Sequence, residues 1–166
     1  NLSPEEQDAI FSYTGASYGD LNRSLRNRVP IDQLDEKTRQ VYDGLISAVE
    51  IAPRLQDDTL LVRQLFSSDL YTGFKLGKIH EGDVIPDLAF MSTSIDPSFI
   101  PPDRFGLVYH IEAPKGTKGL FIGYEDMNPA FWAKESEFIL PPNIRQKVKG
   151  YQQIGAQIVG QMRLVP

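Results

Sequence analysis

Two acidic residues, Glu135 and Glu137, stand directly before the apolar run Phe138-Ile139-Leu140, which predicts a buried strand. Because residues i and i+2 of a strand point to the same side, both carboxylates are expected to project together from the mouth of a sheet. Two like charges held that close cost free energy unless a cation or a polar ligand lies between them. The pair therefore suits a site that stabilises positive charge, although a solvated strand edge would carry the same residues.

Two further features lie on other predicted strands. Arg63 stands inside the apolar run 59–66, where a charge is costly unless it is paired. Its guanidinium is expected either in a structural ion pair or as a clamp on a phosphate or carboxylate. Ser92-Thr93-Ser94 ends another strand, where small hydroxyls either hold a neighbouring carboxylate or sugar hydroxyl in place or start a turn.

The composition narrows the classes of protein. The chain has 166 residues, and we expect residues 1–166 to form one domain, cut from a longer protein since the first residue is Asn. A net charge of −5 without a long run of like charges makes nucleic acid an unexpected partner. No apolar run is long enough to span a bilayer. There is no cysteine, and the two histidines lie far apart in sequence, so no metal site is expected.

The first third of the chain predicts helices. Ser3 can cap a helix, Pro4 fits its first position, and Glu6 completes a capping box. This helix is expected to end at Gly15, and a second short helix to cover residues 18–25. A third follows helical spacing from residue 32 to Pro53.

The remainder of the chain predicts strands. Short apolar segments separated by Gly and Pro cover residues 59–66, 88–92, 107–111, 120–122, 138–140, 144–151 and 157–164. Helices followed by strands indicate an α+β fold. The strands lie too close together in sequence for helical crossovers, so the sheets are expected to be mostly antiparallel.

The order of the motifs along the chain is informative. Arg63, then Ser92-Thr93-Ser94, then Glu135-x-Glu137 resemble the Arg / Ser-Thr-Ser / Glu-x-Glu signature of bacterial mono-ADP-ribosyltransferase toxins. The stretch Tyr13-Thr14-Gly15-x-x-Tyr18-x-x-x-Asn22-x-x-Leu25-Arg26 looks like the helical element that precedes the catalytic core in binary actin-modifying toxins and type III secreted effectors. The resemblance covers nearly the whole chain. Gln64 and Ala89 depart from the residues that many relatives have there, so some contact with NAD is expected to be lost or remade.

The resemblance implies two β-sheets packed nearly at right angles around an NAD cleft, with helices on one side. Arg63 is implied to bind the phosphates and the nicotinamide ribose, and Ser92 to orient Glu137. Glu137 is implied to be the catalytic glutamate, which contacts the ribose 2′-hydroxyl, and Glu135 to orient and help deprotonate the acceptor. The residues implied to contact NAD are Tyr18, Asn22, Arg63, Gln64, Ser92, Thr93, Arg104, Phe105 and Glu137, with Tyr13 beneath the site.

Two loops complete this comparison. The segment 95–105 lies where the family has its phosphate–nicotinamide loop, so Arg104 is implied to reach a phosphate. Phe99 or Phe105 would stack on the nicotinamide ring or anchor the loop on the core. Just before Glu135, Phe131 or Trp132 would either contact the acceptor protein or lie buried.

The resemblance implies a secreted toxin or effector, expected to be monomeric, that acts in the target-cell cytoplasm. It would transfer ADP-ribose from NAD to an arginine of a target protein, since a Glu at position 135 matches the arginine-modifying members. Actin and small GTPases are the candidate acceptors, and a host protein is a possible activator. Two alternatives keep the fold: an NAD glycohydrolase, in which water replaces arginine, and a non-enzymatic docking module of a larger toxin.

Overall fold

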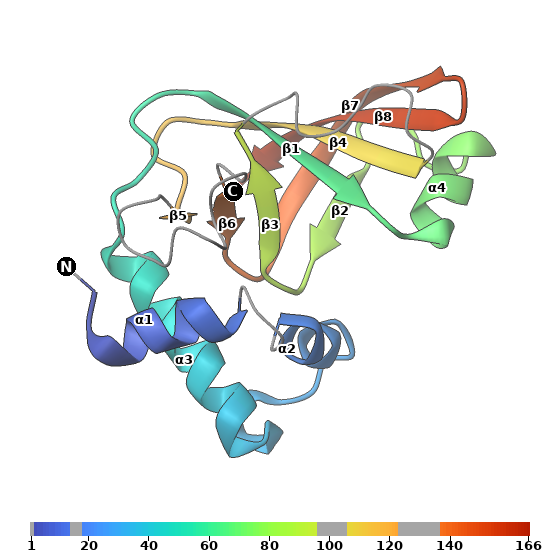
Figure 1. The fold of residues 1–166 in the computed structure, drawn as a ribbon. Helices are drawn as coiled ribbons and strands as arrows, with labels where there is room; N and C mark the ends of the chain where they lie inside the picture. The colour runs from blue at the N-terminus through green and yellow to red at the C-terminus, as the bar shows by residue number, and fades with distance from the viewer. Residues whose placement is uncertain (1, 14–17, 96–105, 123–136) are drawn as a thin grey trace.

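The structure is a computed structural model that describes residues 2–13, 18–95, 106–122 and 137–166. Three helices precede the strands, and a fourth follows the first strand (Figure 1). The helices are α1 (Pro4–Ser12), α2 (Tyr18–Arg26), α3 (Glu36–Ile51) and α4 (Ser68–Lys75), with a 3₁₀ turn at Ile31–Gln33. The strands are β1 (Thr59–Leu65), β2 (Val84–Asp87), β3 (Met91–Ser94), β4 (Gly106–Ala113), β5 (Leu120–Ile122), β6 (Glu137–Leu140), β7 (Ile144–Ile154) and β8 (Gln157–Val165).

The predicted start of α1 is confirmed. The backbone N–H of Glu6 donates to Ser3 Oγ at 3.1 Å, and the backbone N–H of Ser3 donates to Glu6 Oε1 at 3.0 Å. This reciprocal pair satisfies two amides that the helix itself leaves without acceptors. Helix α3 begins later than expected, because the 3₁₀ turn takes up residues 31–33 and Asp35 provides the cap.

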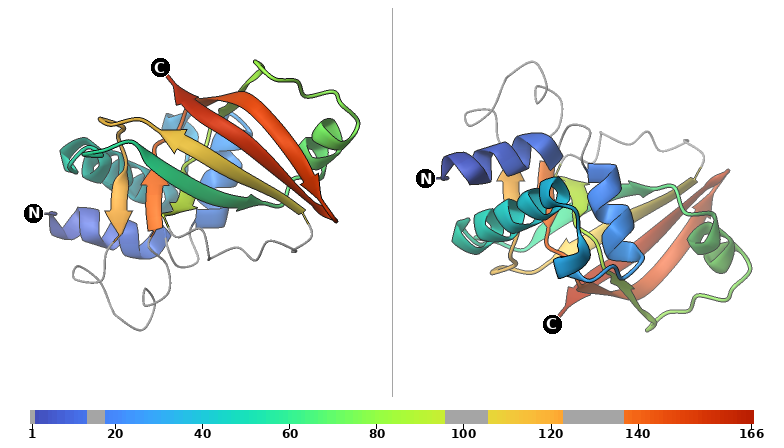
Figure 2. Two further views of the ribbon diagram at one scale, coloured as in Figure 1. Left: turned by 90° about the horizontal axis from the view of Figure 1, so that it is seen from above. Right: turned by 90° about the horizontal axis from the view of Figure 1, so that it is seen from below.

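The strands form one continuous ladder in the order β2-β7-β8-β4-β1-β3-β6-β5. Among the strand pairs of the described residues, β4 with β8 is the single parallel pair, so the expected antiparallel preference is confirmed. The two halves of the ladder meet between β1 and β3 at a single bridge, Val62 to Ser94. Strands β3, β5 and β6 cross the direction of β1, β4, β7 and β8, as both views in Figure 2 show. The two crossed sheets implied by the family resemblance are therefore two halves of one ladder.

Each half of the ladder has its own core. The helical half consists of α1–α3 with β3, β5 and β6, and its buried apolar residues include Ile10, Leu21, Leu45, Phe90 and Ile139. The far half consists of α4 with β1, β4, β7 and β8, and its core includes Leu61, Phe74, Tyr109, Val148 and Ile158. The second face of β3 and β6 also packs into this core, through Met91, Phe138 and Leu140. Helices α1–α3 lie together on one side of the strands (Figure 1).

Two features differ from the sequence-based expectation. Helix α4 was not predicted; it is short, and Ser67 caps it by accepting the Leu70 N–H at 3.2 Å. The segment 88–92, expected as one strand, is a break followed by β3, and β2 precedes it. The break has a local cause, because Asp87 Oδ1 accepts the Ala89 N–H at 2.9 Å and so turns the backbone between the two strands. Strand β2 consequently pairs with β7 while β3 pairs with β1 and β6.

Candidate functional site

A cavity of about 430 Å³ lies where the end of α1 and one face of α2 meet β1 and β3. Most of its lining residues carry polar groups, and three of them are arginines. The lining residues are Tyr13, Gly19, Asn22, Arg23, Arg26, Asn27, Arg63 and Ser92. The cavity therefore brings together Asn22, Arg63 and Ser92, which the sequence predicted as site residues from three separate elements.

Arg63 reaches the cavity from the interior of β1. Its Nη1 donates to the backbone oxygen of Ser92 at 2.7 Å, and its buried Nε has no hydrogen-bond partner among the described residues. Burial lowers the pKa of the guanidinium, and the negative charge of Asp87 is the largest influence that opposes this shift. None of the ion pairs between described residues involves Arg63. An arginine with donors not taken up by a carboxylate favours the clamp over the structural ion pair.

Tyr13 and Asn22 form a buried polar link between the helices and β3. Asn22 Nδ2 donates to the Tyr13 hydroxyl at 3.1 Å, and the Phe90 N–H donates to Asn22 Oδ1 at 3.1 Å. The Tyr13 hydroxyl also shares a hydrogen bond with the side chain of Ser92, and burial raises the pKa of Tyr13. Tyr13 therefore keeps its proton at neutral pH. The oxygen and the nitrogen of the Asn22 amide are both engaged in these bonds, which hold α2 against the segment that leads into β3. A contact between Asn22 and NAD stays a prediction.

Glu137 is the first residue of β6 and is buried, with 7% of its surface exposed. It pairs with Ser94, so strand alternation places it on the same face as Ser92. Phe138 and Leu140 point to the opposite face of β6, where they belong to the core of the far half, and this alternation sets the side on which Glu137 lies. The charge of Glu137 acts on both Arg63 and Tyr13. Glu137 is not among the residues that line the cavity, but it lies on the strand next to Ser92, whose backbone oxygen accepts a hydrogen bond from Arg63.

Two of the described residues that were predicted for the site, Thr93 and Gln64, do not line the cavity. Thr93 Oγ1 donates to the Phe138 backbone oxygen at 2.6 Å, across from the face that carries Ser92. Gln64 alternates with Arg63 along β1 and does not line the cavity. Tyr18 begins α2. The remaining predicted site residues, which are Phe99, Arg104, Phe105, Phe131, Trp132 and Glu135, lie outside the described residues.

Two residues near the cavity were given no role from the sequence. Arg26 lies one helical turn after Asn22 on α2, and its Nη2 lies 3.5 Å from Asp87 Oδ2. The i, i+4 spacing between Asn22 and Arg26 is the signal that places them on one face. Asp87, which stands in a predicted gap between strands, gives no comparable signal.

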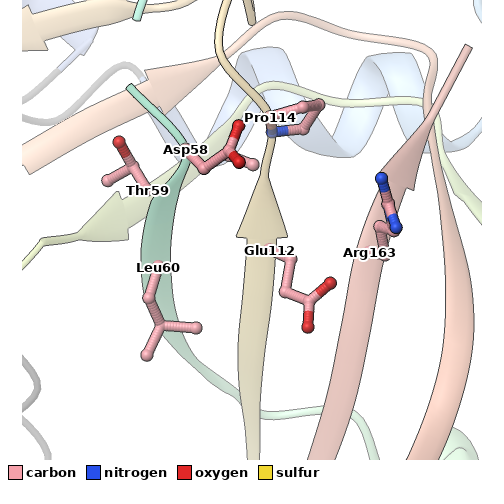
Figure 3. Close-up of a pocket in the computed structure, with 7 residues that line it drawn as sticks. Asp58, Thr59, Leu60, Glu112, Pro114 and Arg163 are labelled. Atoms are coloured by element: carbon pink, nitrogen blue, oxygen red, sulfur yellow. The ribbon is translucent and has the colours of Figure 1, made fainter. Parts of the chain in front are cut away.

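A second hollow, of about 260 Å³, lies on the opposite face of the sheet (Figure 3). Leu60, Glu112 and Arg163 line it in register on three neighbouring strands, and Leu60 is three residues from Arg63, so alternation turns the two side chains to opposite faces. Glu112 is already paired with Lys149 at 3.8 Å. This hollow is separate from the site around Arg63. Within the described ranges, no three His, Asp or Glu side chains gather as metal ligands, and no helix is long and apolar enough to cross a membrane.

Comparison with known proteins identifies the family. The sequence matches the family model of the ADP-ribosyltransferase exoenzymes over residues 1–164. This chain belongs to that family. The NAD(+)–arginine ADP-ribosyltransferase EFV of Enterococcus faecalis is 26% identical over 158 residues, which are 89% of this chain and 29% of that protein. The chain thus spans less than a third of the length of this curated relative.

Solved structures of similar proteins share the fold. An ADP-ribosyltransferase from Clostridium botulinum matches with a TM-score of 0.80 and 20% identity, over 98% of this chain and 87% of that chain. The exoenzyme of the C3 type from Clostridium limosum matches with a TM-score of 0.74 and 17% identity, over 100% of this chain and 87% of that chain. A protein from S. aureus, solved with NAD, matches with a TM-score of 0.79 and 18% identity, over 99% of this chain and 88% of that chain. The predicted α+β fold is confirmed by these matches.

Proposed function

We propose that this chain is a mono-ADP-ribosyltransferase domain that transfers ADP-ribose from NAD to an arginine side chain of a target protein. Family membership supports the reaction class, and the arginine-specific relative supports the acceptor. The observation that carries the proposal is that Arg63, whose buried Nε has no partner among the described residues, donates to Ser92 on β3, the strand that pairs with β6, where the carboxylate of Glu137 is buried. A site that binds and cleaves NAD needs a cation to bind the pyrophosphate. It also needs an anion to stabilise the positive charge that forms on the ribose when nicotinamide leaves.

The chemistry follows from the charges. When the bond between nicotinamide and ribose breaks, the electron pair leaves with nicotinamide and the ribose becomes an oxocarbenium-like cation. A fixed carboxylate near that cation stabilises the transition state more than the ground state. Glu137 supplies this charge from the rigid start of β6. A nitrogen of the acceptor arginine then bonds to the ribose carbon and gives up a proton.

The acceptor side of the reaction is assigned to Glu135. An arginine is normally cationic and therefore a poor nucleophile, so a second carboxylate that aligns it and takes its proton accelerates the transfer. Two glutamates two positions apart would divide these tasks, Glu137 acting on the sugar and Glu135 on the acceptor.

The NAD site in this proposal extends beyond the two charges. Arg63 clamps the pyrophosphate, and Ser92 orients Glu137. Tyr18, Asn22, Arg104 and Phe105 are assigned further contacts with NAD, as the family resemblance implies, whereas Gln64 and Thr93 do not line the cavity and are left out of the proposed site. No metal ion takes part. The exposed polar cavity beside α2 supports this arrangement, because it joins Asn22, Arg63 and Ser92.

The biological setting is proposed from the family. The protein is a secreted toxin or effector that acts in the cytoplasm of a target cell. Its partner is a protein that bears an acceptor arginine, with actin and small GTPases as candidates, and a host protein is a candidate activator.

Incubation of the domain with labelled NAD and a target-cell lysate tests the proposal. We expect a labelled protein whose modification maps to an arginine by mass spectrometry. Glu135→Ala is expected to abolish protein labelling while nicotinamide release from NAD continues. Nicotinamide release without any labelled protein would instead identify a glycohydrolase. No NAD binding by calorimetry would leave only the non-enzymatic docking module.

A further inference from the structure

Asp87, at the end of β2, joins three elements through its carboxylate. Oδ1 accepts the Ala89 N–H at 2.9 Å and so fixes the backbone that leads into β3. Oδ2 lies 3.5 Å from Nη2 of Arg26 on α2. The side chain of Asp87 is 15% exposed and that of Arg26 is 46% exposed, so the carboxylate is the more enclosed member of the pair. The carboxylate of Asp87 therefore contacts both the backbone that leads into β3 and Arg26, an arginine that lines the cavity.

The charge of Asp87 also reaches Arg63. Among the surrounding charges it is the strongest that supports the ionised guanidinium, which burial disfavours. It also acts on Tyr109, the β4 partner of Arg63, whose buried hydroxyl has no hydrogen-bond partner among the described residues. No described ion pair joins Asp87 to Arg63. Asp87 therefore balances the charge of Arg63 without occupying its donors.

This arrangement differs from an ordinary buried ion pair. A carboxylate bonded directly to Arg63 would satisfy the guanidinium and leave little for a ligand. A carboxylate held at a distance by Arg26 and the Ala89 N–H keeps the cation stable and its Nε available. Such preorganisation lowers the cost of ordering the arginines when an anion binds.

We infer that Asp87 is a positioning residue of the NAD site, which holds Arg26 toward the cavity and balances the charge of Arg63 so that both guanidinium groups can receive the pyrophosphate. This inference rests on the proposed function, since it assumes that NAD enters the cavity. A carboxylate near a phosphate also repels it, and the two effects have opposite signs. The sign of the change in NAD affinity therefore decides between positioning and simple repulsion.

The test is the variant Asp87→Asn, which keeps the shape and the acceptor for the Ala89 N–H but removes the charge. We expect the Kd for NAD, measured by calorimetry, and the KM for NAD to rise roughly three- to tenfold, equivalent to about 0.7–1.4 kcal/mol. The kcat is expected to stay within about twofold, because Asp87 acts on binding groups only. Asp87→Glu, which keeps the charge, should stay closer to the wild-type Kd.

Glu112→Gln is the matched control. It also removes one negative charge and an ion pair, that with Lys149 at 3.8 Å, but on the face of the sheet shown in Figure 3. Its Kd for NAD is expected to equal that of the wild type. An equal rise in both variants would show an effect of net charge alone and would overturn the inference.

Other outcomes are equally decisive. Asp87→Asn with a lower Kd would show that Asp87 mainly repels the ligand, and an unchanged Kd would show that it has no net influence on binding; either result overturns the inference. A wild-type protein that binds no NAD would refute the proposed function itself. If Asp87→Asn does not fold, Arg26→Gln replaces it, because Arg26 is half exposed and Asp87 then stays in place. Arg26→Gln is expected to raise the Kd by a similar factor, and an unchanged Kd would contradict the role assigned to the pair.

Discussion

The helical half and the far half of the molecule are both well packed, yet they differ in the polar groups that they bury. The helical half buries Glu6, Asn22, Thr93, Ser94 and Glu137, whereas the far half buries the two glutamines Gln146 and Gln157. Buried polar groups are costly unless they are bonded, so their concentration marks the region that has a task beyond folding. The site residues lie in that region, and β1 contributes Arg63 from across the boundary.

The two halves of the molecule also differ in the length of their strands. Strands β7 and β8 have 11 and 9 residues and form a long ladder with β4 and β1. Strands β3 and β6, which carry Ser92 and Glu137, have four residues each. Such short strands depend on their neighbours for position, and here α1 and α2 hold them through Tyr13 and Asn22. The site should therefore be sensitive to the helical layer and tolerant of damage to the far core.

One large-to-small substitution in each core tests whether the site depends on the helical half more than on the far half. Leu45→Ala on α3 and Ile158→Ala on β8 each remove a side chain with 0% exposure, and each is expected to lower the free energy of unfolding by about 2–5 kcal/mol. Only Leu45→Ala should also raise the Kd for NAD, because α3 supports α1 and so Tyr13. Denaturant titration and calorimetry on the folded proteins measure the two effects. The same Kd in both variants would remove the distinction.

A smaller effect is expected from Tyr13→Phe, which deletes one hydroxyl from the buried link. Asn22 Nδ2 would lose its acceptor, at a cost of about 1–3 kcal/mol of unfolding free energy. The KM for NAD should rise, because Ser92 and α2 lose a shared partner. Tyr151→Phe in the far half is the control, since Tyr151 is 40% exposed, and it should change stability by less than about 0.5 kcal/mol. Equal changes in the two variants would argue against the link.

The smallest effect is expected at the start of α1. Ser3→Ala removes a helix cap and should cost about 1 kcal/mol without changing the Kd for NAD. The Ser3 backbone N–H is the main cause that lowers the pKa of Glu6. A lowered folded pKa adds stability above the ordinary Glu value of about 4.3, which is lost as the pH falls through the folded value. Because Glu6→Gln removes this titration, the difference in Tm between wild type and Glu6→Gln is expected to be larger at pH 6 than at pH 3. An equal difference at both values would show that Glu6 plays no part.

Local signals made much of this structure predictable. The capping box at Ser3, the strand at 120–122 and the buried strand at 138–140 were predicted from neighbouring residues. Arg63 and Ser92 were found because a charge in an apolar strand and a run of hydroxyls are unusual. The role of Asp87 and the parallel pairing of β4 with β8 could not be predicted, because both depend on segments far apart in sequence. Helix α4 was missed for a different reason, since eight residues give too few turns for a clear period.

The claim on which the account depends is that the charge of Glu137 stabilises the sugar cation. Glu137→Gln keeps the size of this buried side chain and removes its charge. The most direct measurement is the rate of nicotinamide release at saturating NAD, together with the Kd for NAD. We expect the rate to fall by about 10²–10³-fold while the Kd changes by less than about threefold. A variant that releases nicotinamide at the wild-type rate would contradict the account.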